Sequence, residues 1–352
     1  MKMTYEYMGD LHKKLYVEGF SDSELKNMAK NHLKFIPRKK LYRYRPSNPK
    51  EMNTLKNNSI WLSDPTTFHD MFDSLVAMES RENIEWYYHL ILYFKITYEA
   101  YVKVALEYDD EFVSYEEWVE AICKQAKDMD FEKAKEEYGE LVKNNFQVDS
   151  EVIKHNCKQA EQIAEFLNAV RTYPREKFSI ASFTNTYDNR AMWENYASNY
   201  TGFCVEYDFK RNFENLSRCE LEDILHLLPI KYYKTRPMFD SIYFIEDFID
   251  CKMQNGYLDF DGEFFIAELY KTMLSKRKEY SFENEWRYVL HKQSCGERKF
   301  PHISRIILGK DIAEKDEETI YDIAKQLNVE VYKQKVNFEL DTMEYVKIKQ
   351  DM

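Results

Sequence analysis

The chain has 352 residues, a formal net charge of −12 and 44% hydrophobic residues, so it is long enough for one large domain with an insertion or for two ordinary domains. An acidic chain without a basic tail lacks the clustered Lys and Arg of proteins that coat nucleic acids. Only eight glycines occur, and no two lie closer than Gly256 and Gly262. A Walker loop and a dinucleotide-binding glycine fingerprint are therefore excluded.

Cysteine usage and hydropathy predict the compartment. The six cysteines are scattered without a CxxC pair, which fits free thiols in a reducing cytosol. The N-terminus has no signal-type apolar core, and the most apolar run, Trp86–Tyr98, is too short to span a bilayer. We expect a cytoplasmic protein with no membrane contact.

The first part of the chain combines a helical lead-in with a basic strand. Residues 1–33 are polar, and a helix is expected to start at Ser21–Glu24. Residues 34–45 then carry six basic side chains and no acidic one, a local reversal of sign at which an anion could bind. The strand 41–45 places Arg43 and Arg45 on one face, and Tyr42 and Tyr44 on the other. A short helix and a strand over 59–63 follow.

A polar loop and a helical segment come next. The loop at 66–73 offers His69, Asp70 and Asp73 as metal-ligand types, but a loop that caps a helix with Asp is the commoner use, and we expect no metal. Residues 82–170 are charged, helix-periodic and almost free of Gly and Pro, which predicts a helical insertion of several helices.

Strand patterns resume at 177–184, where Ser182 and Thr184 share a face. Asp188 or Asn189 is expected to cap a helix with Trp193 and Tyr196 on its aromatic stripe. Gly202 is the expected C-cap. The later elements are strands at 203–209, 230–233, 303–309, 329–335 and 342–348, and helices at 241–252, 262–277 and 314–327. The pattern predicts an α+β fold whose core comprises residues 34–81 and 171–352.

The strongest chemical signal is the segment Tyr280–Leu290, which reads as one β-strand. Alternation places Glu283, Glu285 and Arg287 on one face. Charges on a half-apolar strand are costly to bury, so they need ion-pair partners or a wet cleft. A structural ion-pair network and a functional site both remain open on this spacing.

Four segments in this order resemble a bacterial family known only as a domain of unknown function, numbered two-nine-seven-one. They are Leu-Tyr-Arg-Tyr-Arg-Pro46 with Ile60-Trp-Leu-Ser63, the run from Ser182-Phe-Thr through the 188–197 helix to Gly202-Phe-Cys-Val-Glu-Tyr-Asp208, Phe282-Glu-Asn-Glu-Trp-Arg287, and Ile306-Ile-Leu-Gly309. The family usually has an Asn-Asp-Pro turn where this chain has His69-Asp70-Met71. The family name implies no settled activity.

A more distant resemblance is to ADP-ribosyltransferases, in which a first strand carries an Arg or His that grips NAD. A central Ser-x-Ser/Thr strand and a late Glu-x-Glu strand follow. Arg43, Ser182-Phe-Thr184 and Glu283-Asn-Glu285 are similar and keep this order. The resemblance implies a mixed or antiparallel sheet core, NAD as substrate, and the catalytic residues Glu285, Glu283 and Arg43. It also implies a binding site formed by Tyr44, Arg45, Ser63, Ser182, Thr184, Trp193, Tyr196 and Arg287.

The expected function is therefore NAD-dependent ADP-ribosyl transfer, or NAD hydrolysis, by an enzyme of the kind that serves as a bacterial toxin or antiviral defence effector. The acceptor, protein or nucleic acid, is left open. Two alternatives stay open as well. One is a non-catalytic nucleotide or nucleic-acid binding module that uses the basic 34–45 stretch. The other is a metal-dependent nuclease built on Asp70, Asp73 and the Glu pair.

Overall fold

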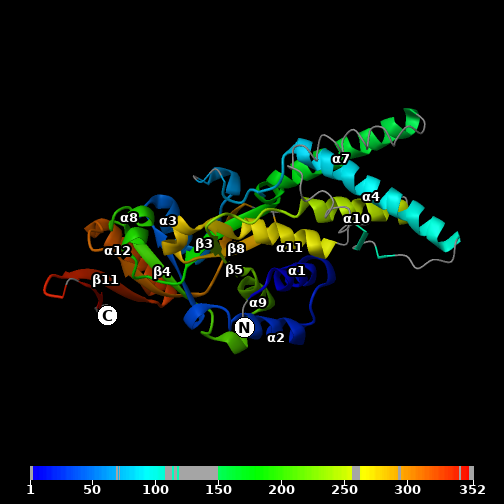
Figure 1. The fold of residues 1–352 in the computed structure, drawn as a ribbon. Coiled ribbons are helices and arrows are strands. Elements are labelled where there is room, and N and C mark those ends of the chain that lie inside the picture. Colours follow the sequence, from blue (N-terminus) through cyan, green and yellow to red (C-terminus); the bar gives the residue numbers. More distant parts are fainter. Residues whose placement is uncertain are drawn as a thin grey trace. The chain divides into compact units, whose positions relative to one another are not determined.

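The computed structural model describes residues 3–68, 70, 72–107, 113–114, 117–118, 150–255, 262–291, 295–340 and 342–348. They form a mixed α+β fold in two units (Figure 1). The sheet unit comprises residues 1–75, 173–237 and 262–352. The helical unit comprises residues 76–172 and 238–261, so the segment 238–261, placed in the core by the sequence analysis, belongs with the helices.

The sheet unit is built on an eight-stranded sheet in the order β12-β11-β10-β4-β1-β3-β8-β5. β10 and β11 pair in parallel, and the other neighbours are antiparallel. The expected α+β class with a mixed sheet is confirmed. The strands in sheet order are Thr342–Lys347, Glu330–Asn337, Ile303–Leu308, Phe203–Asp208, Lys40–Arg45, Phe178–Thr184, Glu285–His291 and Leu227–Pro229.

The register of β1, β3 and β8 decides which candidate residues share a face. Tyr42 lies opposite Thr184, and Thr184 lies opposite Glu285, so all three point to one side of the sheet. Arg43 points to the other side together with Phe183, and its guanidinium carbon is 5.1 Å from the centre of the Phe183 ring. Arg43 and Glu285 therefore lie on opposite faces.

Helix α8 (Arg190–Tyr196) covers part of the face that carries Tyr42. The side chain of Asn189 accepts a hydrogen bond from the Met192 amide, which identifies Asn189, and not Asp188, as the N-cap. Trp193 is 1% exposed and meets the ring of Tyr44 edge-on, with 5.1 Å between ring centroids. Trp193 thus packs α8 onto the sheet, whereas Tyr196 of the same stripe is 44% exposed.

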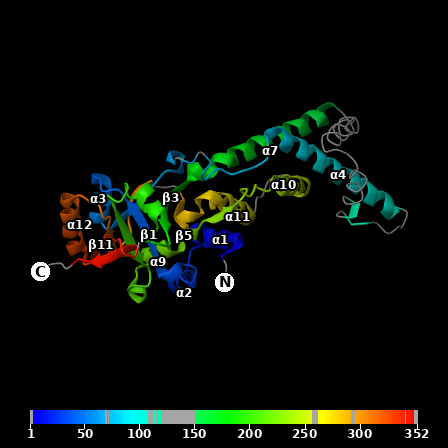
Figure 2. The ribbon, with the colours of Figure 1, turned by 60° about the vertical axis from the view of Figure 1, so that its left-hand side comes forward.

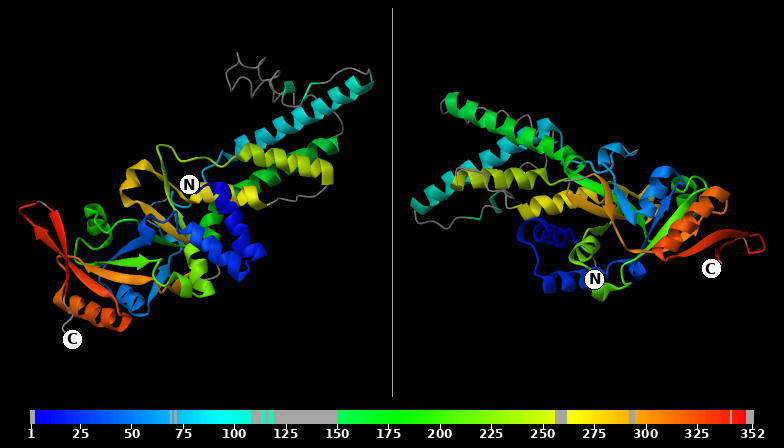
Figure 3. Two further views of the ribbon diagram at one scale, coloured as in Figure 1. Left: turned by 90° about the horizontal axis from the view of Figure 1, so that it is seen from below. Right: turned by 180° about the vertical axis from the view of Figure 1, so that it is seen from behind.

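Other helices of this unit pack in pairs. α1 (Tyr5–Lys13) lies beside α11 (Gly262–Met273), and α2 (Asp22–His32) lies beside α9 (Arg218–Leu225), as Figure 3 shows. α3 (Pro49–Lys56) lies beside α12 (Glu314–Leu327) (Figure 2). The helix start expected at Ser21 is confirmed by a capping box in which Ser21 and Glu24 each accept a hydrogen bond from the other's amide.

Two elements next to Glu283 and Glu285 differ from what the sequence predicts. The helix expected over 262–277 ends at Met273, and Ser275–Arg277 forms β7, which pairs in parallel with β6 (Lys231–Tyr233). The single strand expected over 280–290 is also wrong in its first half, because Lys278–Glu283 is a 3-10 helix, η5. Asn284 ends η5 with φ 45° and ψ 47°, a left-handed conformation that Asn tolerates and that a strand cannot contain.

The helical unit contains α4 (Arg81–Glu107), α10 (Ser241–Asn255) and the first part of α7 (Ser150–Lys177). The hydroxyl of Tyr88 on α4 donates to Oε1 of Gln159 on α7 over 2.7 Å. Lys95 joins α4 to α10 through its ion pair with Asp250 at 2.5 Å. In the portion of the chain that the structure describes, no helix has the length and apolarity needed to cross a membrane.

Gly309 and Gly202 fill positions where two loops meet too closely for any side chain. A Cβ at Gly309 would lie 2.0 Å from the carbonyl oxygen of Tyr200, and one at Gly202 would lie 2.1 Å from that of Arg45. The helix α8 already ends at Tyr196, so Gly202 does not act as its C-cap. It is required for close approach instead.

We expect Gly309→Ala to lower the free energy of unfolding by about 1–3 kcal/mol, since the backbone must shift to relieve the clash. Urea denaturation checks this. The control is Gly19→Ala, where a Cβ meets nothing within 4 Å and only the positive φ of +79° opposes it. Equal effects of the two substitutions would contradict the role assigned to the close contact.

Candidate functional site

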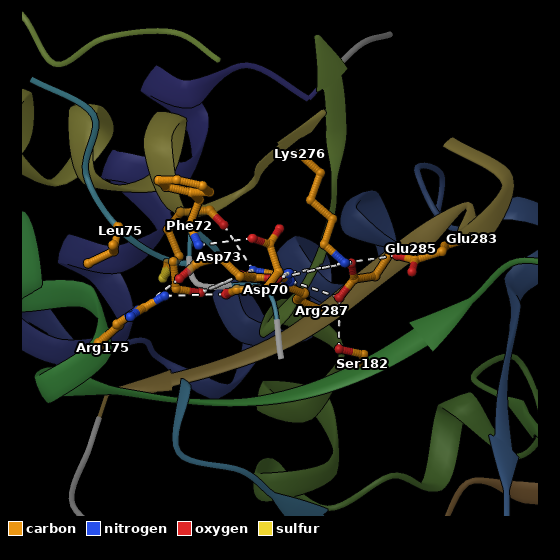
Figure 4. Close-up of polar contacts among 12 residues, drawn as sticks. Asp70, Phe72, Asp73, Leu75, Arg175, Ser182, Lys276, Glu283, Glu285 and Arg287 are labelled. Atoms are coloured by element: carbon orange, nitrogen blue, oxygen red, sulfur yellow. Dashed lines mark hydrogen bonds and ion pairs between the residues drawn. The ribbon is translucent and has the colours of Figure 1, made fainter. Parts of the chain in front are cut away.

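Arg287 on β8 is the centre of a buried ionic cluster (Figure 4). Its side chain is 1% exposed. Its Nη1 and Nη2 donate to the two carboxylate oxygens of Asp73 over 2.8 and 2.7 Å, and its Nε donates to Oε1 of Glu285 over 2.8 Å. The carbonyl of Met273 accepts a further bond at 3.0 Å. One guanidinium therefore holds two carboxylates from distant parts of the chain.

Lys276 on β7 completes the cluster. Its Nζ lies 2.8 Å from Oε2 of Glu285, 2.8 Å from Oε2 of Glu283 and 3.7 Å from Oδ2 of Asp73. The sequence analysis missed this lysine, because Lys276 lies within the helix expected over 262–277. The signal that could have found it was a basic run next to two glutamates. Glu283 reaches the cluster from η5 and not from the strand.

Burial and neighbouring charge act in opposite directions on these acids. Burial by itself would raise the pKa of Glu285, but Arg287 and Lys276 outweigh burial, and the net pKa is lowered. The same balance lowers the pKa of Asp73 to about 2. Both carboxylates are therefore ionised at neutral pH. With Glu283, three formal negative charges meet the two positive charges of Lys276 and Arg287, which leaves the cluster negative.

The cluster reaches solvent through two hydroxyl groups. Ser182 on β3 is exposed, and its Oγ donates to Oε1 of Glu285 over 2.7 Å. Tyr196 is 44% exposed, and its hydroxyl donates to Oε1 of Glu283 over 2.6 Å. Each glutamate is thus buried at its carboxylate but linked to the surface by one donor. A substrate that displaced or joined these hydroxyls would meet the negative side of the cluster.

A cavity of about 310 Å³ adjoins the cluster at Asp73 and Lys276. Asp73 and Lys276 form part of its wall, with Arg236, Arg277, Tyr280 and Phe72. All of these residues belong to the sheet unit.

The remaining candidate residues lie apart from the cluster or serve the packing around it. Arg45 pairs with Glu51 at 3.3 Å, and the Tyr44 hydroxyl donates to the Thr186 carbonyl over 3.2 Å. Ser63 joins Ile180 through two main-chain hydrogen bonds. Thr184 is buried, and its Oγ1 has no hydrogen-bond partner among the described residues. The structure thus brings together Ser182, Tyr196, Glu283, Glu285 and Arg287, and it separates Arg43, Arg45, Tyr44 and Trp193 from them.

The residues behind the two alternative functions are largely engaged elsewhere. Lys40 in the basic stretch contacts Glu206 at 3.0 Å and Asp208 at 3.5 Å, so part of that positive charge is balanced. Among the residues that the structure describes, no three His, Cys, Asp or Glu side chains are arranged to hold a metal ion. Asp73 is bound by Arg287 instead, and His69 lies outside the described residues.

Comparison with known proteins gives one match, which is to a family model. No curated protein and no solved structure matches the chain. Residues 192–288 match the model of a family described as "Protein of unknown function (DUF2971)". The matched stretch contains Tyr196, Glu283, Glu285 and Arg287, and it supports the resemblance of this chain to that family.

Proposed function

We propose that the protein cleaves the bond between nicotinamide and ribose in NAD and passes ADP-ribose to an acceptor or to water. The observation that carries the proposal is the contact between the exposed Ser182 and the ionised Glu285 on adjacent strands. It places a negative carboxylate one hydroxyl group away from solvent, at the edge of a cluster with surplus negative charge.

This arrangement suits the electrostatics of the reaction. As the carbon–nitrogen bond breaks, its electron pair leaves with nicotinamide and the ribose gains positive oxocarbenium charge. A fixed carboxylate stabilises that charge, and Glu285 is held in place by Arg287 and Lys276 before any substrate arrives. In this role Arg287 and Lys276 are positioning residues.

Glu283 is suited to handle the acceptor. A hydroxyl group or water that forms the new bond to the ribose carbon must give up a proton, and the Glu283 carboxylate accepts it. Tyr196 connects Glu283 to the surface by which an acceptor enters. Arg43 has no part in the proposal, because it lies on the opposite face of the sheet.

The test is release of nicotinamide from NAD by the full chain, with cell extract added to supply acceptors. We expect Glu285→Gln to lower the rate by about 10²-fold, the effect typical of one removed electrostatic group. Ser182→Ala, at an exposed position, should lower it by about threefold to tenfold, the worth of one hydrogen bond.

Glu279→Gln is the matched control, because Glu279 is an exposed glutamate in the same 3-10 helix. It should leave the rate unchanged. Circular dichroism confirms that each variant is folded. A wild-type chain that releases no nicotinamide, or a folded Glu285→Gln variant with the full rate, would refute the proposal.

A further inference from the structure

The wall of the cavity beside the cluster carries three basic side chains, Arg236, Lys276 and Arg277, and two acidic ones, Asp70 and Asp73. Asp73 is held at both oxygens by Arg287, and Lys276 is held by Glu283 and Glu285. The charges that remain on the wall are those of Arg236, Arg277 and Asp70. In a chain with a net charge of −12, this is a local reversal of sign.

Arg236 is fixed in the cavity wall by the main chain. Its Nη1 donates to the Phe72 carbonyl, and its Nη2 donates to the Leu75 and Thr272 carbonyls over 2.8 and 3.1 Å. Within the described part of the chain, no carboxylate oxygen lies within 4.0 Å of it. These bonds orient the guanidinium without an ion pair, although Asp73 and Asp70 attract its charge from farther away. An arginine held in this way can still receive an anion.

Arg277 is the second unpaired cation. It is exposed, it follows Lys276 directly, and it forms no ion pair with any carboxylate that the structure describes. Two aromatic rings stand at the same cavity, Tyr280 at 36% exposed and Phe72 at 55% exposed. Large aromatic side chains at that exposure, beside cations, offer a face on which a planar base can stack.

We propose that this cavity binds a nucleotide, with a phosphoryl group between Arg236 and Arg277 and the base against Tyr280 or Phe72. The exposed guanidinium of Arg277 can present its fork to the oxygens of a phosphoryl group, while Arg236, whose terminal nitrogens are engaged by carbonyls, contributes mainly its charge. A volume of about 310 Å³ is at the lower end for small-ligand sites. The identity of the nucleotide as part of NAD rests on the proposed function. The preference for a phosphoryl anion rests on the cavity alone.

The test is calorimetric titration of the full chain with ADP, inorganic pyrophosphate and adenosine. ADP and pyrophosphate should bind, and adenosine should bind at least about tenfold more weakly than ADP, because the cations supply most of the attraction. Arg277→Ala should weaken ADP binding about tenfold or more. Lys278→Ala removes an exposed cation one residue further on, outside the cavity wall, and should change affinity less than about threefold.

A second variant separates the base from the phosphate. Tyr280→Ala should weaken ADP about tenfold, within the range for one stacked base, and leave pyrophosphate nearly unchanged. Both substituted positions are exposed, so the variants are expected to fold. Absence of ADP binding at millimolar concentration, or equal binding by wild type and Arg277→Ala, would overturn the inference.

The outcomes also separate this inference from the proposed reaction. Glu285→Gln should lose nicotinamide release and keep ADP binding, because Glu285 is not part of the cavity wall. Arg277-dependent ADP binding without NAD cleavage would leave the cavity assignment standing and refute the reaction. NAD cleavage without ADP binding would leave the proposed reaction standing and refute the cavity assignment.

Discussion

Replacing Arg287 with Met is expected to lower the free energy of unfolding of the sheet unit by about 3–5 kcal/mol, the cost of breaking a buried ion pair on one side. Arg287 is 1% exposed, and its removal would leave Asp73 and Glu285 buried, with Lys276 as the remaining cation that lies within 4.0 Å of both among the described residues. A Met side chain of similar length fills much of the volume that Arg287 occupies. The loss of unfolding free energy therefore comes mainly from the unpaired buried carboxylates and less from a cavity.

Hydrogen exchange of the peptides that contain β3 and β8 measures this loss in the sheet unit separately from the helical unit. The double variant Arg287→Met/Asp73→Asn should lose less free energy of unfolding than the two single variants lose together. The reason is that Asp73→Asn removes one of the carboxylates that Arg287→Met leaves without its arginine. Arg218→Met is the control, because Arg218 pairs with Asp22 and Glu222 at the surface. A loss below about 1 kcal/mol for Arg287→Met would contradict the central role of this side chain.

Acidification is expected to weaken the sheet unit between about pH 6.5 and pH 4.5, because three buried histidines and the half-buried His12 are neutral in the folded state. Burial lowers the pKa of His12, His32 and His302 to about 4 and that of His226 to about 3. In the unfolded chain each titrates near 6.5. Below that pH the unfolded state binds protons that the folded state does not, so stability falls as pH falls.

Other groups set the window for this measurement. Burial raises the pKa of Asp223 to about 6, which offsets the proton uptake of one histidine in the same range. Asp73 and Glu285 have lowered pKa values, so their contribution is lost mainly below about pH 4.5. The net loss on going from about pH 6.5 to pH 4.5 should exceed about 3 kcal/mol, given roughly 1.4 kcal/mol per pH unit for each uncompensated proton.

Urea unfolding at several pH values checks the slope. His226→Asn keeps a donor for the Val289 carbonyl, which accepts from Nδ1 over 2.9 Å, and should reduce the slope by about one proton. His155→Asn, at an exposed position of the helical unit where the side chain contacts Gln159, is the control. A stability that stays flat across this range would contradict the neutral burial of these histidines.

Periodic stretches of the sequence predicted their elements well. The alternating strand 41–45, the strand 177–184 and the helix 314–327 are confirmed within a residue or two, because one hydrophobic period dominates each of them. Short or locally ambiguous stretches failed. Residues 275–277 continue a helical pattern, and only pairing with β6, which is distant in sequence, makes them a strand.

In the candidate site, too, contacts between residues distant in sequence could not be predicted from local patterns. Glu283, Glu285, Arg287 and Ser182 were found from spacing and resemblance, and they do meet. Their ion-pair partners Lys276 and Asp73 come from other segments. No local sequence pattern predicts which cation pairs with which carboxylate. The face of the sheet on which Arg43 lies depends on the register between β1 and β3, and the sequence of either strand alone does not contain it.

The position of the helical unit within the chain has a consequence for biosynthesis. β1 ends at Arg45, but its neighbours β3 and β4 begin only at Phe178 and Phe203, beyond the first pass through the helical unit. At ribosomal speeds of roughly 5–20 residues per second, β1 waits several seconds or longer for a partner. Asp73 waits longer still for Arg287 to leave the ribosome. The nascent chain therefore carries an unpaired strand for more than a third of its synthesis and an acid without its arginine partner for more than half of it. The helix α4, which lies between these segments in sequence, has time to fold first.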